Sequence, residues 1–350
     1  MKILIIGPTW VGDMVMSQTL YRCLQQQYPQ ATLDVLAVDW CRPLLARMPE
    51  VHRALPMSIG HGQLNLGLRK AMGQQLRSEC YQQAIVLTNS WKSALIPWFA
   101  KIPQRTGWRG EWRYGLLNDL RHLDPQRYPM QIQRYAALAY PKAAANGMFP
   151  EMLPWPQLTV TAKAIEQTKM QLGLPTEPKP IALAPGAAQT IRKCWPPRHY
   201  ATLAVKLLQQ GHWLLLLGAA RDQKVCAAIQ QQLPDTLKPR CFNYAGQTSL
   251  SEVIDLLAGC QAIVSNDSGL MHVACALGIA VVALFGPTEP SYTPPLTLNR
   301  RILRASPLEV GEPHDPRDQG YHPRLIHLAP QQVFAELQGL LATDETICVS

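Results

Sequence analysis

The sequence lacks the segments with which proteins cross or enter membranes. No window comes close to about 18 uninterrupted apolar residues, the length that spans a bilayer. At the N-terminus only the apolar run Ile3–Ile6 separates Lys2 from Gly7, and this run is too short for the core of a signal peptide. We therefore expect a protein that stays in the cytoplasm.

Metal-binding and disulfide patterns are also missing. The nine cysteines are an odd number and form no C-x-x-C pair. No D-x-D occurs, and no cluster of carboxylates and histidines has the spacing of a metal site. Most cysteines lie in apolar, helix-like stretches, where a free cysteine behaves as a small hydrophobic residue. The sequence thus predicts no bound metal and a reducing compartment.

Two nucleotide-binding signatures are incomplete. Gly7 and Gly12 stand five residues apart, as in a P-loop, but Asp13 and Met14 occupy the places of its lysine and hydroxyl residue. An acid beside a triphosphate would repel it, so a P-loop NTPase is not expected. The G-x-G-x-x-G fingerprint is absent as well, which argues against a dehydrogenase.

Charge is present but unevenly distributed. The chain carries 33 Lys and Arg against 24 Asp and Glu, a net charge of +9. Residues 1–150 hold 17 of the basic and 8 of the acidic residues, whereas residues 151–350 hold 16 of each. A basic N-terminal half indicates an anionic partner, such as nucleic acid, a phosphorylated lipid or a membrane surface, or else only serves solubility. Charge alone does not decide between these.

The 350 residues suffice for two domains, and each half alternates β-like with helical segments. In the first half the expected strands are 3–6, 33–38 and 84–87, and the expected helices are 13–28, 63–78 and 131–145. In the second half the expected strands are 181–184, 213–217, 262–265 and 280–285, and the expected helices are 198–210, 222–233, 250–258, 269–277 and 330–341. Residues 146–180 contain Asn146-Gly147 and several prolines and are predicted to link the domains. Residues 287–320 are predicted to be an irregular loop.

This pattern predicts an α/β protein with two Rossmann-like domains, each a doubly wound parallel sheet, that face each other across a cleft. The expected boundaries are 1–160 and 161–350. The last helix, at about 330–342, is expected to close the second domain or to pack back toward the first.

Four strand-to-helix turns carry candidate site residues, and each has an ordinary structural alternative. Asp13 is either a helix cap or a general base held at a helix N-terminus. The loop 184–196 holds small residues and then Lys193, which suits a diphosphate or only a solvated surface. Asp222 is either another cap or an acid that contacts a ribose. The turn 265–272 places Asp267, Ser268, Gly269 and His272 at the carboxyl end of a strand, where open α/β sheets bind ligands.

These turns resemble, in order and spacing, the heptosyltransferase family, which is glycosyltransferase family 9. The resemblance covers nearly the whole chain. The stretches that carry it are Gly7–Met14, Cys41–Leu45, Arg105–Gly110, Tyr114–Asp119, Lys193–Pro196 and Asn266–His272.

The resemblance implies a GT-B fold with an acceptor-binding N-terminal domain and a donor-binding C-terminal domain. It implies Asp13 and Lys193 as catalytic residues. It implies donor contacts at Thr9, Gly186, Lys193, Asp222, Thr248, Asp267, Ser268, Gly269 and His272. For a phosphorylated acceptor, the candidates are Lys92, Arg105, Arg109 and Arg113, with Arg121.

The implied reaction is inverting and metal-independent. It moves L-glycero-D-manno-heptose from ADP-heptose to the first heptose of heptosyl-Kdo2-lipid A, in the lipopolysaccharide core of Gram-negative bacteria. Asp13 would deprotonate the acceptor hydroxyl. The enzyme would work at the cytoplasmic face of the inner membrane, in peripheral contact with it, and no nucleic acid partner is implied. The alternatives are another GT-B nucleotide-sugar enzyme, such as a different family 9 transferase or an epimerase, and a binding module without turnover.

Overall fold

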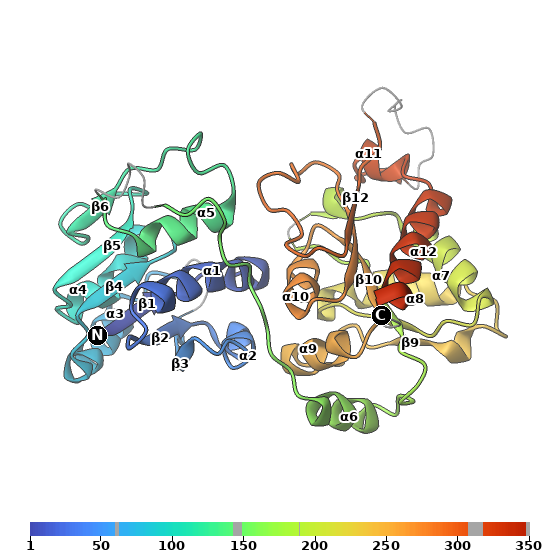
Figure 1. The fold of residues 1–350 in the computed structure, drawn as a ribbon, viewed down its shortest axis with the longest axis horizontal. Helices are drawn as coiled ribbons and strands as arrows, with labels where there is room; N and C mark the ends of the chain where they lie inside the picture. Colours follow the sequence, from blue (N-terminus) through green and yellow to red (C-terminus); the bar gives the residue numbers. More distant parts are fainter. Residues whose placement is uncertain (60–62, 143–148, 189, 307–317, 348–350) are drawn as a thin grey trace. The chain divides into compact units, whose positions relative to one another are not determined.

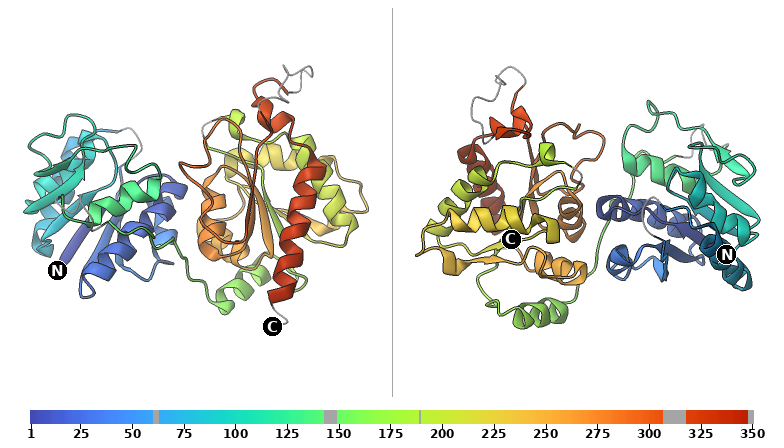
Figure 2. Two further views of the ribbon diagram at one scale, coloured as in Figure 1. Left: turned by 45° about the horizontal axis from the view of Figure 1, so that its top comes forward. Right: turned by 180° about the vertical axis from the view of Figure 1, so that it is seen from behind.

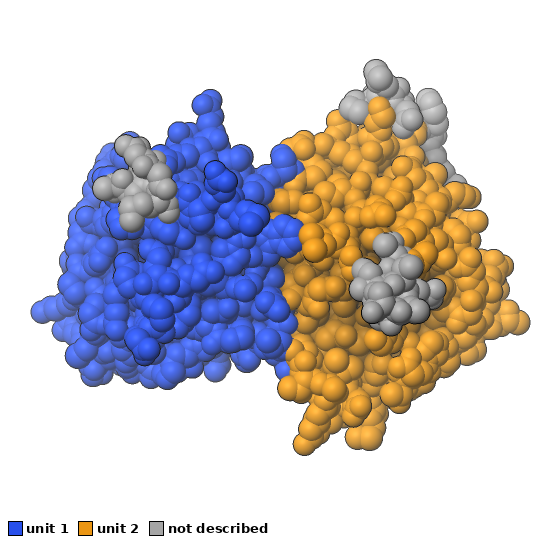
Figure 3. All heavy atoms as spheres, in the orientation of Figure 1, with its two compact units in different colours: residues 1–159, 291–293 blue, residues 160–290, 294–350 orange. Residues whose placement is uncertain are grey.

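A computed structural model of the chain describes residues 1–59, 63–142, 149–188, 190–306 and 318–347. The chain divides into two compact units, coloured separately in Figure 3. Unit 1 consists of Met1–Thr159 and Ser291–Thr293, and unit 2 of Val160–Pro290 and Pro294–Ser350. Asn146-Gly147, Gln189, Cys348 and part of the helix expected at 131–145 lie outside the described residues.

Unit 1 is built on a six-stranded parallel sheet in the order β3-β2-β1-β4-β5-β6 (Figure 1). Its strands are β1 (Lys2–Ile6), β2 (Thr32–Ala37), β3 (Val51–Pro56), β4 (Gln83–Val86), β5 (Gln104–Trp108) and β6 (Asp119–Arg121). The central strand β1 is a continuous apolar run, because helices cover both faces of a parallel sheet.

The helices of unit 1 are α1 (Val11–Gln27), α2 (Arg42–Leu45), α3 (Leu66–Gln75), α4 (Leu95–Phe99) and α5 (Gln131–Ala136). Helix α1 packs against α5, and α3 packs against α4. Met16, Leu20 and Leu24 form the buried stripe of α1, at the four-residue spacing that places side chains on one helix face.

Unit 2 repeats this architecture with the sheet order β12-β11-β10-β7-β8-β9, again all parallel. Its strands are β7 (Ile181–Ala184), β8 (Leu214–Leu216), β9 (Cys241–Asn243), β10 (Ala262–Asn266), β11 (Ala280–Leu284) and β12 (Arg300–Leu303). Counted from β7, this is the strand order of unit 1, and both units therefore have the doubly wound Rossmann topology.

The helices of unit 2 are α6 (Ala162–Gln171), α7 (Pro197–Gln209), α8 (Gln223–Gln231), α9 (Leu250–Ala258), α10 (Gly269–Leu277), α11 (Pro323–Ile326) and α12 (Pro330–Ile347). Helices α7, α8 and α12 contribute to one core with β7, β8, β10 and β11, whereas α9 and α10 pack together (Figure 2). Ser249 and Glu252 form a capping box that fixes the start of α9.

The fold class predicted from the sequence is confirmed, although strands β3, β5, β6, β9 and β12 were not among the expected elements. The stretch 287–320 is not wholly irregular, because it contains the edge strand β12. Helix α5 ends at Ala136 and continues only as a 3₁₀ turn to Ala139. Helix α12 packs against α7, β10, β11 and β12 of its own unit, which is the first of the two expectations for it. Among the described residues, no helix is both long and apolar enough to traverse a membrane.

A buried carboxylate joins β2 to β3 in unit 1. Asp34 has no exposed surface and accepts hydrogen bonds from Arg53 Nη2 (2.6 Å) and from the Tyr81 hydroxyl (2.6 Å). His52 Nδ1 lies 3.0 Å from the other carboxylate oxygen. Burial alone would raise the pKa of Asp34, but the bonds from Arg53, Tyr81 and His52 outweigh it and lower the pKa below its usual range.

Asp34→Asn should therefore reduce the free energy of unfolding by about 1–3 kcal/mol at pH 7, because the variant removes the buried charge that accepts these hydrogen bonds and leaves Arg53 paired with Glu79 alone of its two acids. Urea unfolding measures this. The folded pKa of Asp34 is lowered, so its contribution is complete above the unfolded value of about 3.9 and is lost as the pH falls below it. The difference between wild type and variant should shrink over that range.

Asp39→Asn is the matched control, because Asp39 is exposed and forms a surface ion pair with Arg42 at 3.4 Å. We expect a change below about 1 kcal/mol. Equal losses in the two variants would contradict the assignment of Asp34 as a buried structural charge.

Candidate functional site

Both sheets offer the same place for a ligand. In an open parallel sheet the strand order reverses at one point, and ligands bind beyond the carboxyl ends of the strands there. That point lies between β1 and β4 in unit 1 and between β7 and β10 in unit 2. The candidate turn at Asp13 follows β1, and the turns at Gly186 and Asp267 follow β7 and β10.

In unit 2, a buried amide holds the two turns together. Asn266, the last residue of β10, donates from Nδ2 to the Pro185 carbonyl oxygen at 2.7 Å. Its Oδ1 accepts from the Trp195 amide (3.0 Å) and the Tyr200 hydroxyl (3.2 Å). The fully buried Trp195 in turn donates from its indole to the Leu328 carbonyl oxygen at 3.0 Å. Asn266 therefore fixes the loop after β7 against the end of β10.

Lys193 and Asp267 form an ion pair in this site. The Lys193 ammonium lies 2.8 Å from Asp267 Oδ2, and the Thr288 hydroxyl donates to the same oxygen at 2.8 Å. Asp267 is buried and Lys193 is partly exposed. The structure thus brings together two residues that the sequence assigned separately and adds a third, Thr288.

The start of α10 completes this group. Ser268 precedes the helix, and its hydroxyl lies 3.0 Å from the Ser265 hydroxyl, which donates to the Asn266 carbonyl oxygen. Gly269 begins α10, so the amides of this first turn carry the positive end of the helix dipole. Burial, opposed by the charge of Asp267 and assisted by that of Lys193, lowers the pKa of His272 to about 4. His272 is therefore a neutral imidazole at neutral pH.

Asp222 lies against the glycines that follow β7 and β8. Its carboxylate accepts the Ala219 amide at 2.9 Å, which is the contact of a helix cap. A methyl group on Gly186 would overlap the Asp222 carboxyl group, and one on Gly218 would overlap the Asp222 Cβ. Both glycines are needed for this close approach. Thr248 lies just before α9 and bonds to the Tyr244 carbonyl oxygen at 3.3 Å.

In unit 1, Asp13 lies in the first turn of α1 and contacts α5. The Tyr135 hydroxyl donates to Asp13 Oδ1 at 3.1 Å, and the Gln131 amide lies 3.5 Å from the same oxygen. Tyr135 is buried, and burial together with the Asp13 charge raises its pKa well above the ordinary value. Tyr135 therefore remains a hydrogen-bond donor. Thr9 lies in the turn before α1, where its carbonyl oxygen accepts from the Trp40 indole at 3.0 Å.

The basic candidates of unit 1 differ in burial. Arg113 is 1% exposed and donates to the Thr88 carbonyl oxygen at 2.6 Å, and desolvation lowers its pKa to about 10. Arg105 donates to the carbonyl oxygens of Leu116 (2.6 Å) and Ile102 (2.7 Å). Arg121 is likewise buried and bonded to Asp119. Lys92 is half-buried and Arg109 is exposed. Arg105 is half-buried like Lys92, but its guanidinium is bonded to those two carbonyl oxygens.

Four residues that contact the candidate groups were missed by sequence reasoning. Asn266 stood inside a recognised motif, but an amide with no charge gave no reason to assign it a role. Thr288 lies in a stretch that was predicted to be irregular. Gln131 and Tyr135 are four residues apart on a predicted helix, so the sequence indicated that they share a helix face. It did not indicate that this face packs on Asp13 of α1.

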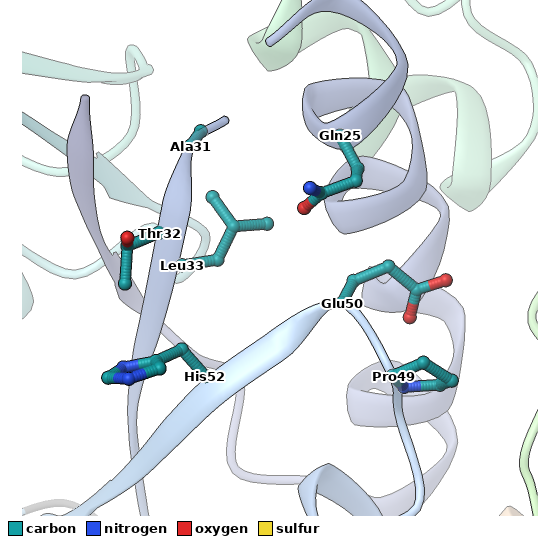
Figure 4. A pocket seen from close by; sticks show the side chains of 7 residues that line it. All are labelled: Gln25, Ala31, Thr32, Leu33, Pro49, Glu50 and His52. Carbon is teal, nitrogen blue, oxygen red and sulfur yellow. The ribbon is translucent and has the colours of Figure 1, made fainter. Parts of the chain in front are cut away.

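The described residues contain no group of three His, Cys, Asp or Glu that is arranged to hold a metal ion. A hollow of about 500 Å³ lies in unit 1 near the amino ends of β2 and β3 (Figure 4). Its lining residues are Gln25, Ala31, Thr32, Leu33, Pro49, Glu50 and His52. This is the end of the sheet opposite to Asp13, so the hollow is not part of the candidate site.

Sequence comparison identifies the relatives of the chain. A model of the family described as glycosyltransferase family 9 (heptosyltransferase) matches residues 69–314. Lipopolysaccharide heptosyltransferase 2 of Escherichia coli K12 is 49% identical over 351 residues, which cover 99% of this chain and all of that protein. Lipooligosaccharide heptosyltransferase 2 of Haemophilus ducreyi is 50% identical over 355 residues, with 98% and 100% covered.

The fold comparison agrees with this result. The structure of E. coli ADP-heptose lps heptosyltransferase II superposes with a TM-score of 0.91 at 48% identity, covering 99% of this chain and 100% of that one. E. coli heptosyltransferase with ADP has a TM-score of 0.69 at 20% identity, which is a likeness of fold alone.

Gly186→Ala should lower the free energy of unfolding by about 1–3 kcal/mol, because the added methyl group overlaps the Asp222 carboxyl group. Thermal unfolding measures the loss. In the double variant Gly186→Ala/Asp222→Ala the overlap is gone, so the two effects should not add.

Gly67→Ala is the control, since a methyl group there meets nothing within 4 Å and Gly67 lies in α3. We expect it to be neutral or slightly stabilising, as alanine favours helices. A double variant whose loss equals the sum of the single losses would contradict the packing of Asp222 on Gly186.

Proposed function

The chain belongs to glycosyltransferase family 9, the heptosyltransferase family, and on that basis we propose that it transfers a heptose from ADP-heptose to the lipopolysaccharide inner core. The family resemblance expected from the sequence is thereby confirmed. The acceptor in this proposal is the first heptose of heptosyl-Kdo2-lipid A, and the transfer inverts the anomeric centre. Identity close to 50% over almost the full length of relatives named heptosyltransferase 2 is the observation that carries the proposal.

Unit 2 is the proposed donor site. The diphosphate of ADP-heptose would bind at the amino end of α10, where Ser268 and Gly269 offer a hydroxyl and backbone amides. Lys193 would neutralise the diphosphate and Asp267 would contact the sugar. Asp222 would accept from the ribose. Gly186, Thr248, His272 and Thr9 of unit 1 are the remaining proposed donor contacts.

Lys193 and the helix dipole are proposed to stabilise the leaving ADP without a metal ion. The charge that develops on the departing diphosphate needs fixed positive groups, and donors held in place before the reaction cost no reorganisation. Asp267 holds the Lys193 ammonium in the site, and Thr288 donates to the same Asp267 oxygen. The neutral His272 adds no charge, and its lowered pKa means that it does not titrate between about pH 5 and 8.

Asp13 is the proposed general base. It would take the proton from the acceptor hydroxyl as the bond from the anomeric carbon to ADP breaks and the new glycosidic bond forms. Tyr135 and Gln131 support this role, because their contacts with Oδ1 fix the orientation of the carboxylate.

The basic N-terminal half is proposed to face the phosphorylated acceptor. Lys92 and Arg109 are the proposed phosphate contacts, and the half-buried Arg105 and the buried Arg113 would act by holding the loops that carry them. Because the proposed acceptor is attached to lipid A, the enzyme would act at the cytoplasmic face of the inner membrane, in peripheral contact with it. No nucleic acid partner is proposed.

Asp13→Asn should lower kcat by roughly 10²–10⁴, the usual contribution of a general base. The assay is ADP release from ADP-heptose in the presence of heptosyl-Kdo2-lipid A. Wild-type turnover should be the same with and without EDTA, since no step needs a divalent ion.

Asp39→Asn serves as the control, because Asp39 is an exposed acid in the same unit. If Asp13→Asn keeps the wild-type kcat, Asp13 is not the general base. Consumption of ADP-heptose without any acceptor would reject the transfer itself and favour an epimerase.

Lys193→Gln should lower kcat/KM for ADP-heptose by about 10²-fold or more, as expected for a donor that stabilises transition-state charge. Initial rates over a range of ADP-heptose concentrations give this value. Lys238→Gln is the matched control, because Lys238 pairs with the exposed Asp235 at 2.7 Å, away from the site. An unchanged kcat/KM in Lys193→Gln would show that the diphosphate is held by other groups.

A further inference from the structure

Two loops of unit 1 are locked together by a buried arginine. Arg113, in the loop after β5, reaches the Thr88 carbonyl oxygen at 2.6 Å and Asn89 Oδ1 at 3.3 Å, both in the loop after β4. The Glu111 carboxylate accepts the Trp91 amide at 3.1 Å, and the Glu111 amide donates to the Asn89 carbonyl oxygen at 3.1 Å. These contacts hold the tip of the β5 loop on the β4 loop.

A second buried arginine attaches a third segment. Arg69, in α3, donates from Nη1 to the Lys92 carbonyl oxygen at 3.0 Å. Its Nε and Nη2 reach the carbonyl oxygens of Leu64 (2.6 Å) and Gln63 (3.0 Å), just before the helix. Arg69 is 7% exposed, and burial lowers its pKa. The segment before α3 and the loops after β4 and β5 therefore form one braced surface.

This surface exposes large apolar side chains. Trp112 is 87% exposed and Tyr114 58%, and their rings lie edge to face with centroids 6.4 Å apart. Leu66 and Leu64 are 50% and 41% exposed. Gly110 allows the loop to approach its neighbour, since a methyl group there would overlap the Asn89 carbonyl group. The two buried cations, Arg113 and Arg69, thus hold in place a surface that exposes aromatic and aliphatic side chains.

Basic side chains border these groups. Arg109 is exposed and lies over the Tyr114 ring, 5.7 Å from its centroid. Lys70 is exposed on α3, one turn after Leu66 and on the same face. Glu111 is the acid among them, and its carboxylate accepts the Trp91 amide. We call the set Leu64, Leu66, Lys70, Arg109, Trp112 and Tyr114 the aromatic platform.

We propose that the aromatic platform docks on the surface of a bilayer that contains anionic phospholipids. Tryptophan and tyrosine favour the interface between hydrocarbon and water, because their rings are apolar at one end and hydrogen-bond at the other. Arginine and lysine are attracted by lipid phosphates and by the negative surface potential. Residues 1–150 carry an excess of nine positive charges, and a negatively charged membrane surface attracts such a domain.

This inference rests on the peripheral membrane contact in the proposed function and names the surface that makes it, and its test requires neither donor nor acceptor. The test uses the full-length protein and sedimentation with vesicles of phosphatidylcholine alone or mixed with phosphatidylglycerol, without substrate. Wild type should bind the anionic vesicles at least ten-fold more tightly than the neutral ones. Added salt should weaken this binding, since each basic residue near the surface contributes about five-fold.

Trp112→Ser should reduce binding to the anionic vesicles by about ten-fold, because most of the tryptophan area is lost from the interface. Its exposure means that unfolding should be unaffected, which thermal unfolding checks. Met152→Ala is the matched control: Met152 is 89% exposed in the same unit but outside the platform, and its replacement should leave binding unchanged.

Equal binding to neutral and anionic vesicles, or equal binding by wild type and Trp112→Ser, would overturn the proposal. A deacylated, water-soluble acceptor separates a sugar site from a lipid site. If Trp112→Ser raises KM for that acceptor and leaves vesicle binding intact, the platform is an acceptor subsite and the docking proposal fails. Loss of vesicle binding with an unchanged KM supports docking, and it does so even if the proposed transfer reaction is wrong.

Discussion

The carboxamide of Asn266 is the contact on which the unit 2 site depends. It lies fully buried between the two strands where the sheet reverses its order, and it bonds to Pro185 on one side and to Trp195 on the other. A buried side-chain amide without hydrogen-bond partners is costly. The loop after β7 is therefore held in the position where its backbone groups bond to the Asn266 carboxamide. That loop carries Gly186 and leads to Lys193, and β10 leads to Asp267. One neutral side chain thus sets the positions of the charged ones.

Much of the fold could be predicted from the sequence because the central strands are continuous apolar runs and the long helices have regular stripes. The helices α9 and α10 begin and end where the pattern places them. The edge strand β12 could not be predicted, because it contains two arginines and lies in a proline-rich stretch. Strands β6 and β9 have three residues each, which is too short for a periodic signal.

The site was predictable as a set of turns but not as a set of contacts. Sequence order placed Asp13, Lys193 and Asp267 after strands, and the parallel sheets bring such turns to one edge of each unit. Lys193 and Asp267 are 74 residues apart in sequence, so no local sequence pattern predicts that they pair. The basic residues were the hardest to interpret. A count of charges does not distinguish Arg113, which is buried and bonded to carbonyl oxygens, from Arg109, which is exposed.

Lys193 is already paired with Asp267, so its binding to a diphosphate would require this ion pair to open. Asp267 Oδ2 accepts from Lys193 and from Thr288, each at 2.8 Å. If the Lys193 ammonium turns toward a phosphate, the carboxylate keeps the hydroxyl of Thr288, so it is not left without a donor in a buried position. The exchange then costs less than the breaking of an isolated buried pair, which is several kcal/mol. Thr288 thereby allows Lys193 to be held in place before the donor binds and released to it afterwards, as the proposed function requires.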